Sequence, residues 1–129
     1  MKKKIMIVDD NLDVLSLVKK GIERLTDEYE LIGVDSGKKC FELLNKNHTP
    51  DLILLDIMMP ETNGWDVLAR LRSNKSWEKI PVIFLTAKTD DFSKGFGILT
   101  SAGYITKPFK LEDLNNRIEE FFERGHING

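Results

Sequence analysis

Three short, continuously apolar runs constrain the fold of this chain more than any other feature of its sequence. They occupy residues 5–8, 52–55 and 82–85. Apolar runs of this length, without polar alternation, are typical of parallel strands that helices cover on both faces. Residues 29–34 interleave polar and apolar positions and predict an edge strand, and residues 103–106 predict a fifth, short strand.

Between these runs, apolar residues recur at helical spacing and predict amphipathic helices. The first helix would begin at an N-cap formed by Asp10 or Asn11. A fourth helix, around residues 89–100, is predicted to be weak, because Gly95 and Gly97 each cost about 1 kcal/mol in a helix interior. The apolar positions of the other four helices are Val14, Leu15, Val18, Ile22 and Leu25; Cys40, Leu43 and Leu44; Leu68 and Leu71; and Leu111, Leu114, Ile118 and Phe121.

The alternation of strands and helices predicts an α/β fold, a doubly wound parallel sheet of five strands with five helices on its two faces. A chain of 129 residues is long enough for one domain. We place that domain at residues 1–124. The polar, glycine-containing end at residues 125–129 predicts a flexible tail.

Composition and charge exclude several classes of function. A net charge of −2 argues against direct nucleic-acid binding, which depends on clustered Lys and Arg. No apolar stretch approaches the roughly 20 residues of a membrane span, and no secretory signal is visible. The single cysteine, Cys40, cannot form an internal disulfide, which fits a reducing compartment. These features predict a soluble, cytoplasmic protein.

The residues that follow the predicted strands indicate the chemistry of the chain, because ligands of open α/β sheets bind beyond the carboxyl ends of the strands. Each of these residues has an ordinary structural explanation when it is taken alone. Three carboxylates at one sheet edge, however, would repel one another without a cation, and Mg²⁺ prefers such oxygen ligands. The strand-end residues are Asp9, Asp10, Asp56, Thr86 and Lys107.

Four motifs in order, IMIVDDN, DLILLDIMMPETNG, FLTA and YITKPF, resemble the receiver family of two-component response regulators from residue 4 to about residue 123. The resemblance implies a flavodoxin-like sheet with strand order 2-1-3-4-5. It also implies that Asp56 accepts a phosphoryl group from a histidine kinase or a phosphotransfer protein. Asp10 would bind Mg²⁺ directly, Asp9 would act through water, and the Met58 backbone carbonyl would complete the protein ligands.

The remaining roles that the resemblance implies concern the phosphoryl group and the switch. Lys107 would pair with a phosphoryl oxygen, and the Thr86 hydroxyl would bind another. Tyr104 would be the aromatic switch, and a cis peptide bond before Pro108 would aim Lys107 into the site. The output surface would include residues 88–94 and 104–111, with an unknown downstream target and a phosphorylation-dependent homodimer among the expected partners.

One departure from the family pattern concerns the segment before the fifth strand. Family members often carry a Gly-Ala pair followed by acidic residues there, whereas this chain reads Thr100-Ser101-Ala102-Gly103. Together with the glycines of the predicted fourth helix, this departure concerns the output surface and leaves the chemistry of the strand ends unaffected.

Three alternative functions fit the sequence less well. A phosphatase of the haloacid dehalogenase type needs an acid–base aspartate two residues after its nucleophile, where this chain has Met58, which cannot transfer a proton. A degenerate receiver that acts as a constitutive interaction module is disfavoured by the complete set of strand-end residues. A flavin-binding flavodoxin is disfavoured because Asp9 and Asp10 would repel the flavin phosphate.

Overall fold

The computed structural model describes residues 2–87 and 101–127. In these residues the elements alternate along the chain as the apolar runs predict. The predicted fourth helix, around residues 89–100, lies outside the described residues, so the described part of the chain contains four helices rather than the expected five. The elements are β1 (Lys3–Val8), α1 (Leu12–Leu25), β2 (Tyr29–Val34), α2 (Gly37–Asn45), β3 (Leu52–Asp56), α3 (Gly64–Arg72), β4 (Val82–Ala87), β5 (Gly103–Lys107) and α5 (Leu111–Arg124).

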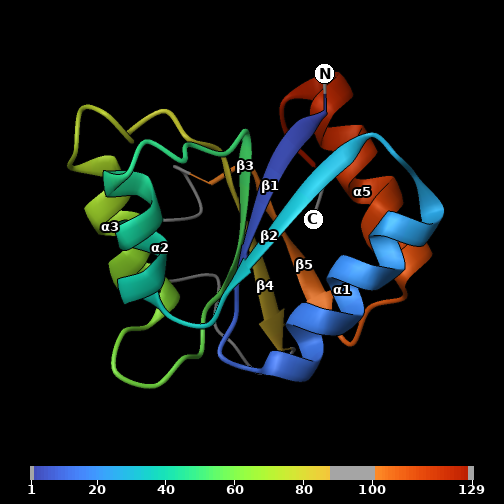
Figure 1. Ribbon diagram of the computed structural model, residues 1–129, viewed down its shortest axis with the longest axis horizontal. Coiled ribbons are helices and arrows are strands. Elements are labelled where there is room, and N and C mark those ends of the chain that lie inside the picture. Colours follow the sequence, from blue (N-terminus) through green and yellow to red (C-terminus); the bar gives the residue numbers. More distant parts are fainter. Residues whose placement is uncertain (1, 88–100, 128–129) are drawn as a thin grey trace.

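The strands form a parallel sheet in the order β2-β1-β3-β4-β5, as predicted. Helices α2 and α3 cover one face of the sheet, and α1 and α5 cover the other (Figure 1). The chain therefore moves outward in both directions from the centre of the sheet. A doubly wound sheet of this order has its switch point between β1 and β3, where a crevice opens beyond the strand ends.

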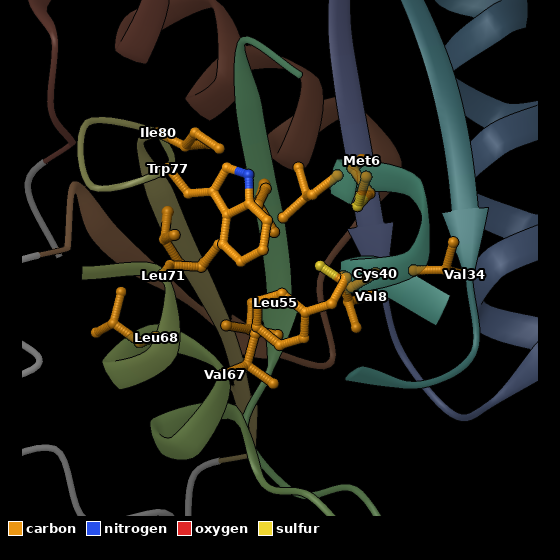
Figure 2. Packing of buried hydrophobic residues seen from close by; sticks show 14 of the residues in the cluster. Met6, Val8, Val34, Cys40, Leu55, Val67, Leu68, Leu71, Trp77 and Ile80 are labelled. Atoms are coloured by element: carbon orange, nitrogen blue, oxygen red, sulfur yellow. The ribbon is translucent and has the colours of Figure 1, made fainter. Parts of the chain in front are cut away.

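Alternation of side chains within each strand divides the core into two clusters. Met6 and Ile53 point toward α2 and α3, whereas Ile5 and Leu52 point toward α1 and α5. Both sides are buried, which is why the strand sequences are continuously apolar. Figure 2 shows the first cluster, in which Cys40 of α2 lies fully buried among apolar side chains.

Asparagine side chains cap the N-termini of α1 and α3. The Asn11 side chain accepts hydrogen bonds from the backbone N–H groups of Asp13 and Val14, so Asn11 is the N-cap of α1 and Asp10 is not. Asn63 likewise caps α3, accepting from the Asp66 N–H. The Asp10 carboxylate is thus not used as a cap at the end of β1.

The segment that follows α5 is docked on the sheet at Ile127. We expected a flexible tail after α5, yet Ile127 is only 5% exposed and its backbone N–H donates to the Ala102 carbonyl at 3.0 Å. The burial of Ile127 was not predicted from the sequence, because the polar residues around it dominated the interpretation of this segment. Ile127 packs in the cluster between the sheet and α5.

No helix in the described ranges is long and apolar enough to cross a lipid bilayer.

Candidate functional site

Neighbouring strands carry the predicted site residues to one edge of the sheet. Asp9 directly follows β1, and Asp56 is the last residue of β3. Thr86 is the second-last residue of β4. Lys107 is the last residue of β5, where it pairs in register with Ala87. Because all strands run parallel, their carboxyl ends lie side by side.

The three predicted aspartates converge at this edge. Carboxylate oxygens of Asp9, Asp10 and Asp56 lie within 4.8 Å of one another. Asp9 is fully buried, Asp56 is 6% exposed and Asp10 is exposed. Burial, followed by the nearby charge of Asp9, raises the pKa of Asp56 from 3.8 to about 6, although Lys107 and the Met58 backbone N–H act in the opposite direction.

Lys107 enters the same cluster from β5. Its Nζ lies 2.8 Å from Asp9 Oδ2 and 3.5 Å from Asp56 Oδ1. Burial lowers the pKa of Lys107, but its hydrogen bond to Asp9 and the charges of Asp9 and Asp56 outweigh burial, so the pKa is raised. Lys107 therefore stays charged and partly neutralises the carboxylates.

Both carboxylate oxygens of Asp9 accept hydrogen bonds. Oδ1 accepts the Asn11 backbone N–H at 3.0 Å, while Oδ2 accepts from Lys107. The sequence predicted a phosphoryl oxygen as the partner of Lys107 and did not predict this ion pair. The pairing depends on how far strand ends lie apart across the sheet, which residue spacing does not report.

The donor set fits Mg²⁺. Two oxygens bound to one Mg²⁺ at about 2.1 Å lie at most about 4.2 Å apart. The observed spread of up to 4.8 Å is closed by a small side-chain rotation or by one bridging water. Asp10 and Asp56 would be the direct ligands, and Asp9, whose oxygens are already engaged, suits contact through water.

The loop after β3 is shaped by Gly64, the first residue of α3. Its N–H donates to the Ile57 carbonyl at 2.8 Å. A Cβ at this position would lie 2.5 Å from the Asp56 carbonyl oxygen and 2.9 Å from the Ile57 Cα, too close for any larger residue without a backbone shift. Glycine therefore allows α3 to begin directly against the end of β3. In the same loop, the Met58 side chain is 65% exposed and offers no proton-transferring group.

The predicted switch residues lie on β4 and β5. Thr86 is 2% exposed, and its hydroxyl donates to the Ala87 carbonyl at 3.0 Å. Tyr104 of β5 is partly buried and packs against the hydrophobic core cluster on the α2 and α3 side of the sheet. The Lys107–Pro108 peptide bond is cis, as the resemblance implied. Residues 88–94 of the predicted output surface lie outside the described residues.

Comparisons with known proteins agree with this arrangement. The profile of the response regulator receiver domain family matches residues 5–119. The chain is 37% identical, over 98% of its length, to the alkaline phosphatase synthesis transcriptional regulatory protein PhoP of Bacillus subtilis and 36% identical, over 95%, to the transcriptional regulatory protein CpxR of Escherichia coli. It spans 51% and 50% of these two relatives, about half the length of each.

Solved structures of similar length share the fold. A CheY-like response regulator receiver domain protein from Methanospirillum hungatei is 38% identical with a TM-score of 0.79, and the match covers 97% of this chain and 96% of that one. The phosphorylated cyanobacterial phytochrome response regulator RcpA is 29% identical with a TM-score of 0.79, and 98% of each chain is covered.

Proposed function

The chain belongs to the receiver domain family of two-component response regulators, and we propose that it accepts a phosphoryl group on Asp56 with Mg²⁺ bound beside it. The observation that carries the proposal is the convergence of Asp9, Asp10, Asp56 and Lys107 at one sheet edge. One of the similar solved structures, RcpA, is described as phosphorylated, which supports this chemistry in a protein of the same fold.

The proposed reaction is a phosphoryl transfer between two side chains. A carboxylate oxygen of Asp56 attacks the phosphorus of a phosphohistidine on a histidine kinase or a phosphotransfer protein. The new P–O bond makes an acyl phosphate, the P–N bond breaks, and the imidazole leaves with the electron pair and takes up a proton. Mg²⁺, when bound, neutralises charge on the transferring phosphoryl oxygens.

Asp56 must be ionised in order to attack. Its pKa of about 6 leaves most molecules ionised at neutral pH. Since burial is the main cause of the raised pKa, the carboxylate is poorly solvated and reacts more readily than one in water. The site thus provides a nucleophile that is available at neutral pH.

Lys107 is close enough to Asp56 to bind the negative charge that a phosphoryl group brings there. It already lies within 3.5 Å of Asp56 while bonded to Asp9. A phosphoryl group on Asp56 adds negative charge on that side, so Lys107 would move its contact from Asp9 to a phosphoryl oxygen. The buried Thr86 hydroxyl would turn from the Ala87 carbonyl to another phosphoryl oxygen, leaving space for Tyr104.

The product is proposed to act as a signal rather than to turn over as in an enzyme. Hydrolysis of the acyl phosphate by a phosphatase mechanism would need a general acid–base beside Asp56, and the exposed Met58 cannot serve. The phosphorylated state would then bind a downstream protein target, or a second copy, through β5 and α5. We propose no direct contact between these residues and nucleic acid or membrane.

The test is incubation with acetyl phosphate and Mg²⁺, followed by intact mass measurement. The wild type should gain the mass of one phosphoryl group, and omission of Mg²⁺ should abolish the gain. Asp56→Asn is nearly isosteric and should fold but stay unlabelled. Absence of labelling in the wild type, or equal labelling of Asp56→Asn, would overturn the proposal.

A further inference from the structure

The segment after α5 turns back and docks at the beginning of β5. Gly125 ends the helix with a left-handed conformation at φ 82°, which its lack of a side chain permits. Ile127 then returns to the sheet, where it is 5% exposed and donates its N–H to the Ala102 carbonyl. Apolar burial and a backbone hydrogen bond thus both hold this residue in place.

The receiving end of β5 is shaped to fit Ile127. Gly103 has a φ of 142°, which side-chain-bearing residues rarely adopt, and a Cβ there would lie 2.4 Å from Ile127 Cγ1. On the other side, the Ala102 N–H donates to the Val82 carbonyl at 2.7 Å. The strand therefore begins between β4 and Ile127.

Lys107 lies at the opposite end of the same strand. It lies four positions after Gly103, which corresponds to about 13 Å of extended backbone. The β4–β5 register runs without interruption from Gly103 opposite Ile83 to Lys107 opposite Ala87. Because β5 is an edge strand of the sheet, β4 fixes it on one side, and a shift at its beginning carries through to Lys107.

We propose that Ile127 is a positioning residue for phosphoryl transfer: docked at the beginning of β5, it fixes the strand that places Lys107 at Asp56. This inference rests on the proposed function. It assigns the short segment after α5 a role in the rate of the reaction rather than in general packing. It also predicts that anything that displaces Ile127 slows phosphorylation.

The proposal separates two properties of the site. The Mg²⁺ ligands come from β1 and β3 and the loop after it, whereas Lys107 comes from β5. Removing the Ile127 side chain should therefore slow phosphorylation at saturating Mg²⁺ and leave Mg²⁺ affinity unchanged. General loosening of the domain would weaken both, since all of the Mg²⁺ ligands depend on the same fold.

The experiment compares Ile127→Ala with the wild type, using phosphoramidate as donor and saturating Mg²⁺. We expect the first-order labelling rate to fall on the order of tenfold, since a misplacement of about 1 Å in a reacting group can cost 100-fold. Ile127→Val keeps most of the packing and should restore most of the rate. The exposed neighbour provides the matched control, and His126→Ala should label like the wild type.

A double variant tests whether Ile127 acts through Lys107. In a Lys107→Ala background, Ile127→Ala should cause no further loss of rate, because the group that it positions is gone. Full additivity of the two losses, an unchanged rate in Ile127→Ala, or a parallel loss of Mg²⁺ affinity would overturn the inference. Failure of the wild type to become labelled would instead overturn the proposed function.

Discussion

Strands β3 and β5 each deliver one charged group to the site, but the sheet holds them differently. Every residue of β3 is buried, and β3 is paired on both sides, with β1 and β4. In β5 only Ile105 is fully buried, and β5 pairs with β4 alone in the sheet order. Asp56 therefore stands on the most enclosed strand and Lys107 on an edge strand.

This difference suggests that β3 is held rigidly and that β5 can move more easily. A strand paired on both sides is costly to move, because any shift breaks two ladders and opens a packed core. An edge strand has one ladder to rearrange and is half exposed. Asp56 is thus fixed on its strand, whereas Lys107 and Tyr104, both on β5, have more freedom to move.

The largest expected effect is on stability, through matched truncations in the two strands. Leu54→Ala removes a fully buried side chain from β3 and should lower the free energy of unfolding by about 3–5 kcal/mol. Ile105→Ala, on the same face of the sheet but on the edge strand, should cost about 2 kcal/mol. Urea denaturation with a constant m-value measures both. Equal losses would show that β5 is as firmly held as β3.

The second effect concerns pH in the absence of divalent cations. The folded protein holds the Asp56 proton up to a pKa of about 6, whereas the unfolded chain releases it near the ordinary value of 3.8. Stability should therefore fall as pH rises from about 4 to 6, by up to about 3 kcal/mol, and stay lower above that window.

Asp56→Asn cannot ionise and serves as the control for this pH effect. Its stability should lack the slope attributed to Asp56 and exceed that of the wild type at neutral pH. Chemical denaturation across this range in a chelating buffer provides the measurement. An identical slope in both proteins would mean that another group causes it.

A smaller effect is expected on Mg²⁺ binding. Asp10→Ala removes an exposed carboxylate from the cluster and should weaken Mg²⁺ affinity by about tenfold, or about 1.4 kcal/mol. Lys107→Ala, on β5, should leave affinity equal or improved, since it removes a positive charge. Calorimetric titration separates the two. Unchanged affinity in Asp10→Ala would remove that residue from the metal site.

The smallest expected effect is on amide exchange, which compares the mobility of β3 and β5 directly. Beryllofluoride, which mimics a phosphoryl group, should change amide exchange in β5 and at the beginning of α5, while the amides of β3 stay protected. Hydrogen exchange with mass spectrometry resolves these segments. Changes confined to α1 would show that the output surface lies elsewhere.

The sequence predicted the sheet and the meeting of the strand-end residues because both follow from local pattern. Continuous apolar runs gave the strands, and polar residues at their ends marked the edge where Asp9, Asp56 and Lys107 meet. Two features were missed because they depend on distance across the fold. The Asp9–Lys107 ion pair joins residues far apart in the chain, and the docking of Ile127 depends on the backbone conformation of Gly103.

The Gly64 contact also had no complete explanation in the sequence. The reason for a glycine at this position is visible only in space, where a Cβ would meet the Asp56 carbonyl oxygen. Capping was easier to predict, since Asn11 stands directly before α1 and needs only its own backbone neighbours.

The buried cysteine has a practical consequence for spectroscopy. Cys40 is fully enclosed, and burial raises its pKa to about 12, so the thiol is protonated at neutral pH. Thiol reagents react with the thiolate and should therefore not modify Cys40 in the folded protein. A cysteine introduced at an exposed position such as His126 could then carry a fluorophore without removal of the native thiol. The wild-type sequence is therefore already a usable background for single-site labelling.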